Sequence, residues 1–209
     1  MLFRSWKGHE PCLEDARRIL ISHPETEFLA ISRAGSALLN SLATKAEFPR
    51  RQPLAIVPGD VESNPDSYHK GKLKPLDQLT PFEFAIYESM KVYLTKNRNK
   101  DSDHVNGMLA FVESYDSHTQ SVGVVTVTGH RLAVYLYTDE DLGNLVYHDI
   151  RPGYASTVMK KQGAELKHVT IWLDACVRGA AYTALSRVSY GRDVLIGGFP
   201  STKHFQPVV

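Results

Sequence analysis

The sequence has little cysteine and no long apolar run. Its two cysteines, Cys12 and Cys176, are far apart and belong to no CxxC motif, so we expect two ordinary buried thiols rather than a disulfide or a zinc site. No apolar stretch approaches the roughly 20 residues that a membrane-spanning helix needs. The first residues, MLFRSWKGHE, lack the apolar core of a secretory signal. These absences predict an intracellular protein without a membrane partner.

An excess of charge of one sign is also missing from the chain as a whole. The 209 residues include 24 Lys and Arg against 23 Asp and Glu, and 43% are hydrophobic. This length and composition exclude a disordered chain and allow one large domain or two small ones. The charge is distributed unevenly, because residues 151–209 carry eight basic and three acidic side chains. A basic C-terminal quarter favours a polyanionic partner such as nucleic acid.

Both ends of the chain have the pattern of an α/β domain. Their apolar spacing predicts helices over 12–21, 33–43 and 180–186. Compact apolar runs predict strands over 27–32, 168–173 and 193–196, and 154–163 has the pattern of a strand end or a helix start. Residues 48–80 are rich in proline and glycine, so we predict a long surface connection there.

The middle of the chain has a different residue pattern, which is typical of short β-strands. Short β-branched and aromatic runs, separated by turn formers such as Asn106-Gly107, occupy residues 90–95, 108–115, 121–128 and 131–138. Such closely spaced antiparallel strands predict a small β-barrel, which the acidic stretch 139–141 closes. The predicted organisation is therefore an α/β domain formed by 1–88 and 139–209, with a barrel inserted at 89–138.

Several segments then resemble one family in its own motif order. The sequence GAAYTALSRV at 179–188 resembles motif VI of superfamily 1 helicases of the Pif1/RecD group, and YASTVMKKQGAEL at 154–166 resembles motif V. Residues 168–174 resemble the strand between these motifs. Residues 27–40 resemble motif IV, and 90–97 with 105–108 are similar to the SH3-like 2B barrel. The sequence departs from the family's usual residues at Met159, Lys161, Ala164, Glu165 and Ala180.

The resemblance implies a fold and an activity. The fold is α/β, a RecA-like domain 2A of the P-loop NTPase type with an inserted small antiparallel SH3-like barrel. The chain has no G-x-x-x-x-G-K-[ST] motif, since its one Gly-Lys pair, Gly71-Lys72, is followed by leucine. The implied function is the C-terminal half of an ATP-dependent 5′→3′ DNA helicase, inactive alone, in the nucleus or a mitochondrion if eukaryotic. The implied partners are single-stranded DNA and an N-terminal RecA-like domain 1A, which would hold most of the ATP and Mg²⁺.

The resemblance also implies a nucleotide site. Arg187 matches the motif VI arginine, whose permanently charged fork would bind the γ-phosphate as negative charge develops on it. Gln162 and Gly163 would lie beside the nucleotide, and Arg33 would reach a phosphate from the same side. The alternatives are a surface Arg187 that caps the C-terminus of a helix and a solvated loop Arg33.

DNA contacts need cations and polar groups that bind phosphates without reading bases. By the resemblance, Thr157 and Lys160 would face the strand, and Lys96, Asn97 and Asn106 would add contacts from the barrel. Each could equally be an ordinary turn or surface residue. For Tyr154 we expect a place in the core rather than on a base. The nine histidines show no ligand spacing, so no metal site is expected.

Two other functions remain open at this point. One is a nucleic-acid-binding module without catalysis, which the basic C-terminal quarter and the predicted barrel favour. The other is a structural or regulatory protein that keeps a RecA-like scaffold. An upstream P-loop would distinguish a motor domain from both.

Overall fold

The computed structural model describes residues 10–69, 72–161, 165–188 and 194–206. The chain forms two compact units. Unit 1 comprises Met1–Pro49 and Tyr154–Val209, and unit 2 comprises Arg50–Gly153. Unit 1 thus unites the two ends of the chain, and unit 2 is inserted between them.

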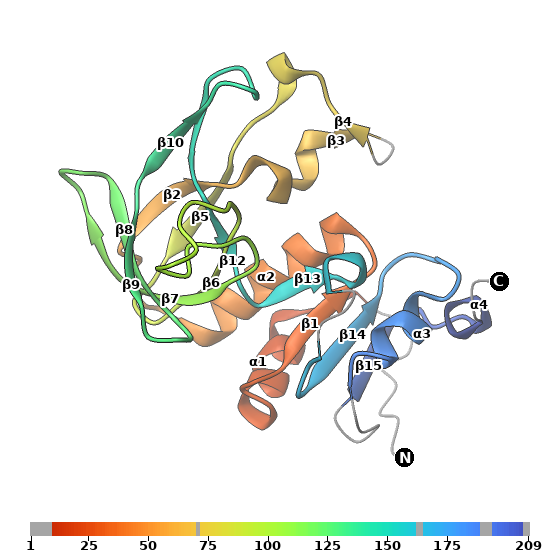
Figure 1. The fold of residues 1–209 in the computed structure, drawn as a ribbon. Coiled ribbons are helices and arrows are strands. Elements are labelled where there is room, and N and C mark those ends of the chain that lie inside the picture. The colour runs from red at the N-terminus through yellow and green to blue at the C-terminus, as the bar shows by residue number, and fades with distance from the viewer. Residues whose placement is uncertain (1–9, 70–71, 162–164, 189–193, 207–209) are drawn as a thin grey trace. The chain divides into compact units, whose positions relative to one another are not determined.

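A parallel sheet of four strands is the centre of unit 1 (Figure 1). Its strands, in spatial order, are β13 (Ala155–Thr157), β1 (Glu27–Ala30), β14 (Val169–Leu173) and β15 (Val194–Gly198). All five residues of β14 are buried, which is typical of an inner parallel strand with both faces covered. The predicted α/β class is confirmed, and a parallel sheet of this kind fits a RecA-like domain.

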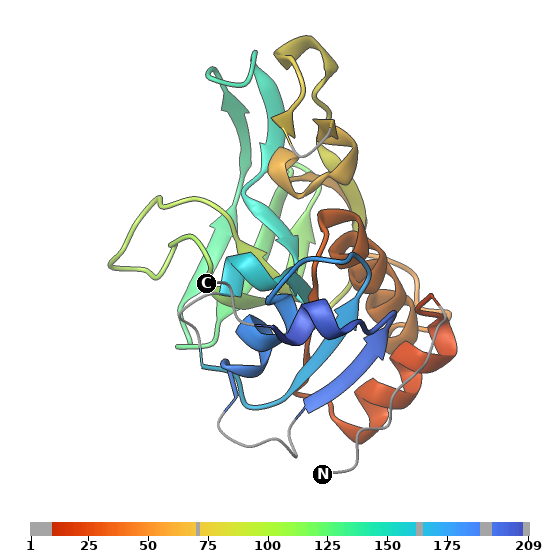
Figure 2. The ribbon, with the colours of Figure 1, turned by 90° about the vertical axis from the view of Figure 1, so that its right-hand side faces the viewer.

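Helices cover both faces of this sheet (Figure 2). One face carries α1 (Leu13–Ser22) and α2 (Arg33–Glu47), and the other carries α3 (Ala180–Leu185), while α4 (Thr202–Phe205) follows β15. Alternate residues of β14 pack with Leu29 against Ala181 and Ala184 of α3. Tyr154 is buried, as predicted. The three predicted helices are confirmed, although α2 continues four residues beyond 43.

Unit 2 contains a five-stranded antiparallel sheet. Its strands, in spatial order, are β12 (Ile150–Pro152), β6 (Lys91–Leu94), β7 (Leu109–Asp116), β8 (Ser121–Thr126) and β9 (Arg131–Val134). A bulge between Val112 and Ser114 interrupts the β7–β8 register. Within the described strands, β9 and β12 are the two edges of the sheet, so its pairing does not close a barrel. The SH3-like barrel stays a prediction.

Three two-stranded ladders complete unit 2. They pair β2 (Ala55–Gly59) with β5 (Phe82–Ile86), β3 (Tyr68–His69) with β4 (Lys72–Leu73), and β10 (Leu136–Asp139) with β11 (Leu145–His148). Single 3-10 turns occur at Val61–Ser63, Pro65–Ser67 and Leu76–Gln78.

The prediction of a long surface connection over 48–80 is wrong for part of the segment, although residues 49–54 and 75–78 are exposed. This segment contains β2, and its Val57 and Val61 are buried. Val61 packs with Leu79 and Tyr147 in a small core of its own. The prolines that suggested a loop are tolerated because β2 pairs only with β5.

Two further expectations differ from the structure. The predicted strand 131–138 divides at Tyr135, because Val134 already pairs with Val122 near the start of β8 and the next residues pair with β11 instead. Both cysteines are free and exposed, so the expectation of buried thiols is wrong. Within the described residues, no helix has the length and apolarity needed to cross a membrane.

The compact units also divide the chain elsewhere than at the predicted positions 88/89 and 138/139. Residues 50–88 and 139–153 belong to unit 2 because their strands pair there, as in the Ile150–Leu94 pair of β12 and β6. The predicted barrel, 89–138, lies within this larger unit.

The packing of β14 generates a stability prediction. Replacement of the fully buried Ile171 by alanine leaves a cavity, so Ile171→Ala should lower the free energy of unfolding by about 2–5 kcal/mol. The matched control is Ile21→Ala on α1, where the side chain is 77% exposed and the expected change is within about 0.5 kcal/mol. Urea denaturation followed by circular dichroism measures both. Equal effects would contradict the assignment of β14 to the centre of the core.

Candidate nucleotide and nucleic-acid interface

Arg187 follows Ser186, the C-cap residue of α3, and is half-buried. Its Nε donates hydrogen bonds to the Thr183 carbonyl (3.3 Å) and to Ser186 Oγ (3.2 Å), and its Nη2 donates to Ser186 Oγ at 2.7 Å. The guanidinium therefore contacts the last turn of its own helix, where a cation also interacts favourably with the helix dipole. This is the arrangement of the capping alternative. Because Ser186 is exposed, the contact lies at the protein surface.

A backbone hydrogen bond joins the two segments that resemble motifs V and VI. The Leu166 amide donates to the Arg187 carbonyl at 2.8 Å. Leu166 precedes the amino end of β14, so Arg187 lies near the amino edge of the parallel sheet. The other two predicted nucleotide contacts, Gln162 and Gly163, lie outside the described residues.

Arg33 is the first residue of α2 and is exposed. It follows the carboxyl end of β1, and the carboxyl ends of parallel strands share one edge of a sheet. Arg33 and Arg187 therefore lie at opposite edges, and the structure does not bring them together. This geometry differs from the predicted approach of both residues to a phosphate from the same side.

The start of α2 contains a carboxylate contact that the sequence did not reveal. The Asp174 carboxylate, just after β14, accepts hydrogen bonds from the Ile31 amide (2.8 Å), the Ser32 amide (3.2 Å) and the Ser32 hydroxyl. Ser32 Oγ in turn accepts from the Gly35 amide at 2.9 Å. A Cβ on Gly35 would overlap the same carboxylate. Asp174 thus supplies negative charge to the positive end of α2.

Thr157 and Lys160 lie at the turn after β13. Thr157 is the last residue of β13 and is buried, and its Oγ1 accepts a hydrogen bond from the Lys160 amide at 3.4 Å. Lys160 is exposed on the 3-10 helix η4 (Val158–Lys161). The hydroxyl of Thr157 therefore contributes to the turn, and Lys160 provides a surface cation beside it.

A second lysine of η4 points inward. Lys161 Nζ lies 2.8 Å from Glu27 Oε1, and the two side chains are only 14% and 12% exposed. Glu27 is the first residue of β1. The sequence did not predict this ion pair, because its partners are far apart in the chain. The parallel pairing of β1 with β13 brings Glu27 near η4, which follows β13.

In unit 2, Lys96 contacts a buried carboxylate. Its Nζ lies 3.6 Å from Asp139 Oδ2, and the Tyr147 hydroxyl donates to the same oxygen at 2.5 Å. Burial raises the pKa of Asp139, but the hydrogen bond from Tyr147 and the charge of Lys96 outweigh it and hold that pKa below its usual range. Lys96 thus has a partner within the unit.

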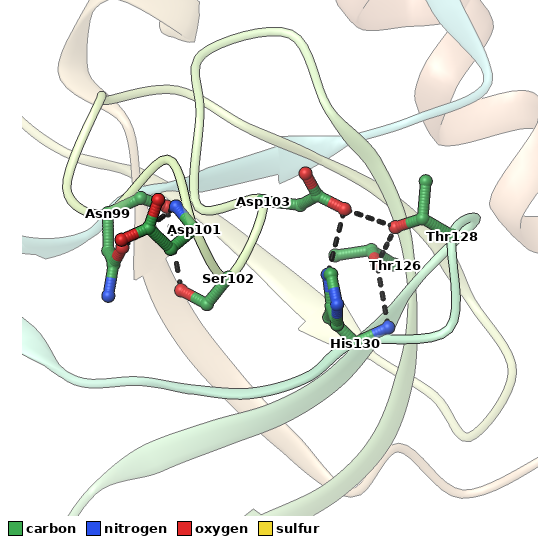
Figure 3. A network of polar contacts seen from close by, with 7 residues as sticks. All are labelled: Asn99, Asp101, Ser102, Asp103, Thr126, Thr128 and His130. Atoms are coloured by element: carbon green, nitrogen blue, oxygen red, sulfur yellow. Dashed lines mark hydrogen bonds and ion pairs between the residues drawn. The ribbon is translucent and has the colours of Figure 1, made fainter.

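Asn97 and Asn106 are brought together at the base of the β6–β7 loop. Asn97 Oδ1 accepts a hydrogen bond from the Asn106 amide at 2.9 Å, and both residues are exposed. The tip of this loop is attached to the β8–β9 turn by Asp103 (Figure 3). The Asp103 carboxylate contacts the Thr128 hydroxyl and lies 2.9 Å from His130 Nδ1. These hydrogen bonds, that of Thr128 first, lower the pKa of Asp103.

Arg98, in the same loop, is a cation that the sequence analysis did not single out. Its Nε lies 2.6 Å from Asp149 Oδ2, and its guanidinium carbon lies 3.8 Å from the centre of the Tyr137 ring. The hydrogen bond that Arg98 donates to Asp149 is the largest of the contributions that raise the pKa of Arg98. The sequence gives little indication of these contacts, because the partners of Arg98 lie far along the chain, in β10 and between β11 and β12.

The described residues contain no group of three His, Cys, Asp or Glu side chains that could hold a metal ion. A cavity of about 380 Å³ lies between the C-terminal turns of α1 and α2. It is lined by Arg17, Leu20, Ile21, Pro24, Ala46, Glu47 and Pro49. None of the predicted site residues is among them.

Comparison with protein-family descriptions finds no match, and comparison with curated proteins finds none either. Solved structures do match. The chain superposes on a structure of two coordinating Pif1 helicases at forked double-stranded DNA with a TM-score of 0.67, 15% identity, 94% of this chain and 45% of that chain covered. The Bacteroides Pif1 helicase in complex with ADP-AlF3 and single-stranded DNA matches with a TM-score of 0.64 at 17% identity. The match covers 94% of this chain and 46% of that chain.

The Pif1 helicase from Candida albicans gives a TM-score of 0.59 at 18% identity, with 93% of this chain and 51% of that chain covered. The chain therefore spans about half the length of the structures that it matches. At these identities the likeness concerns the fold.

The contact between Tyr147 and Asp139 generates a pH-dependent prediction. Tyr147→Phe should lower the free energy of unfolding at pH 7 by about 1–3 kcal/mol, because a buried charged acceptor loses its donor. Since the pKa of Asp139 is lower in the folded state, this stabilisation is present above the unfolded value of about 3.9 and is lost as the pH falls through the folded value. The difference between Tyr147→Phe and the parent should narrow below about pH 4.

Denaturant titrations at several pH values measure this difference. The control is Tyr135→Phe in the same unit, whose side chain is exposed. A Tyr147→Phe effect that stays constant from pH 7 to pH 3 would exclude a role for the Asp139 charge.

Proposed function

Because this chain has a Pif1-like helicase fold, we propose that it supplies the second RecA-like half of an ATP-dependent 5′→3′ DNA helicase. In this proposal unit 1 corresponds to domain 2A, and residues 89–138 within unit 2 correspond to an SH3-like 2B barrel. The observation that carries the proposal is the parallel sheet of unit 1, in which the segments resembling motifs V and VI are joined by the Leu166–Arg187 hydrogen bond. The missing half, domain 1A, would carry the P-loop.

Arg187 is the residue that we assign to the nucleotide. A half-buried guanidinium near the surface fits an anionic group, and its fork matches two phosphate oxygens. On nucleotide binding it would exchange its hydrogen bonds to Ser186 Oγ for the γ-phosphate and stabilise the negative charge that develops there. We assign Gln162 and Gly163 to the same nucleotide, and ATP and Mg²⁺ mainly to domain 1A.

The DNA contacts that we propose come from both units. Thr157 and Lys160 would contact single-stranded DNA from unit 1, and Asn97, Asn106 and Lys96 from unit 2. The exposure of Lys160, Asn97 and Asn106 supports this assignment. Lys96 would contact DNA while its ammonium remains paired with Asp139, so its attraction for a phosphate would be weaker than that of an unpaired lysine. Among the matched helicases, Bacteroides Pif1 is bound to single-stranded DNA.

A nucleic-acid-binding module without catalysis is the second candidate. The observation that favours it is the Arg187 guanidinium bound to its own helix end, which needs no nucleotide to explain it. Both candidates predict binding of single-stranded DNA by the 209-residue chain. They differ in whether a P-loop half is encoded in the coding sequence that precedes it and joins it in an enzyme.

Substitution of Arg187 tests the nucleotide site in the assembled enzyme, meaning this chain together with that P-loop half. Arg187→Ala should leave ATP binding largely unchanged and lower DNA-stimulated hydrolysis by about a thousandfold, because the transition-state charge loses its cation. Arg187→Lys should not restore hydrolysis, since an ammonium lacks the fork. Phosphate release and nucleotide affinity are the measurements.

The control is Arg178→Ala, which removes an exposed arginine of the same unit. Unchanged hydrolysis by Arg187→Ala would reject Arg187 as the arginine finger. Absence of a P-loop half, together with DNA binding by the chain alone, would select the second candidate.

A further inference from the structure

The short helix η4 has two different sides. In a 3-10 helix residues i and i+3 lie on the same side, so Val158 and Lys161 point together and Met159 and Lys160 point elsewhere. Val158 is buried in the core cluster of the parallel sheet, and the Lys161 side chain is 14% exposed. Met159 is 68% exposed, and Lys160 is exposed as well. η4 is therefore held on one side and presents a thioether and an ammonium on the other.

The inward side is held by one apolar and one charged contact. Val158 packs in the cluster that contains Leu29 and Ile171. Lys161 pairs with Glu27 at 2.8 Å, and Glu27 is itself fixed in β1, since its amide donates to the His168 carbonyl at 3.1 Å. The charged contact thus ties η4 to a central strand of the sheet.

A gain in stability is a weak explanation for this half-buried ion pair. Desolvation of two charges costs several kcal/mol per ion, and apolar residues of similar volume often stabilise a protein as well or better. What the ion pair adds is a charged tether between two segments that are far apart in the chain. The Glu27–Lys161 pair ties the end of η4 to the start of β1 and so limits how far the outward residues beside Lys161 can move.

We propose that Glu27 and Lys161 are positioning residues that hold Met159 and Lys160 toward single-stranded DNA. The proposal rests on the DNA-binding part of the proposed function and names how one contact of that surface is built. Lys160 binds a phosphate, and the adjacent Met159 thioether packs against the flat face of a base. Glu27 is acidic and half-buried, so in this proposal it acts on DNA only through Lys161 and η4.

The test measures binding of a fluorescein-labelled oligothymidylate by the 209-residue chain, by fluorescence anisotropy at several salt concentrations. Lys160→Ala should weaken binding about threefold at low salt and reduce the slope of log affinity against log salt by about 0.7, the value for one phosphate contact on a single strand. The matched control is Lys167→Ala, at an exposed lysine whose Nζ lies 3.6 Å from Glu25 Oε2. This substitution should change the affinity and the salt slope less than Lys160→Ala does.

The positioning variants are Glu27→Gln, the apolar pair Glu27→Leu with Lys161→Met, and the exchanged pair Glu27→Lys with Lys161→Glu. The first two should reproduce the loss of affinity and of salt slope seen with Lys160→Ala, and the exchanged pair should restore both. Combination of Lys160→Ala with the apolar pair should give no further loss, because both changes remove the same contact. The apolar pair keeps the packing, so its fold, checked by circular dichroism and thermal unfolding, should match that of the parent.

Three results would overturn the proposal while the parent chain binds DNA. These are an apolar pair that binds like the parent, losses that add up when the apolar pair is combined with Lys160→Ala, and an exchanged pair that folds but restores nothing. If the parent chain does not bind oligothymidylate, the DNA-binding part of the proposed function fails first and the proposal fails with it.

Discussion

The parallel pairing of β1 with β13 and β14 determines where the candidate residues of unit 1 lie. Parallel strands have their amino ends at one edge of the sheet and their carboxyl ends at the other, so each residue's position in its strand fixes its edge. Glu27 and Leu166 are at or before amino ends, and Leu166 holds the backbone of Arg187 there. Thr157 is the last residue of β13, and Arg33 and Asp174 follow the carboxyl ends of β1 and β14. The sheet thus places the backbone of Arg187 near one edge and the start of α2 with Arg33 at the other.

Local patterns were sufficient to predict most elements of unit 1, but not the short helix α4. The periodicity of residues 12–21 and 33–43, the apolar run 168–173 and the alanine-rich 180–186 each correspond to an observed element, because burial on a helix stripe or between two covered faces leaves a direct trace in the sequence. The prediction for residues 48–80 was partly wrong because proline and glycine occur there within the edge strand β2 as well as between strands. The division of 131–138 depends on where β8 begins, which is a property of the partner strand.

The candidate site was predictable in its residue types and less so in its contacts. The position of Arg187 after α3 agrees with the motif, but the direction of its guanidinium depends on Ser186 and Thr183 in the folded helix. The sequence suggests a surface cation at Lys96, but in the folded chain its Nζ lies 3.6 Å from Asp139 Oδ2. The partners of Lys161 and Asp174 are more than a hundred residues away, at Glu27 and at Ser32. Such pairs follow from tertiary pairing, which composition and periodicity do not encode.

The carboxylate of Asp174 has a consequence for how an anion can approach unit 1. The first turn of a long helix is ordinarily an attractive seat for phosphate, and α2 has such a turn beside the carboxyl ends of the strands. Asp174 already occupies the amides of Ile31 and Ser32 and adds its own negative charge. An anion that approached the start of α2 would therefore meet the negative charge of Asp174. If unit 1 binds a phosphate backbone as proposed, Asp174 would repel that backbone from the first turn of α2.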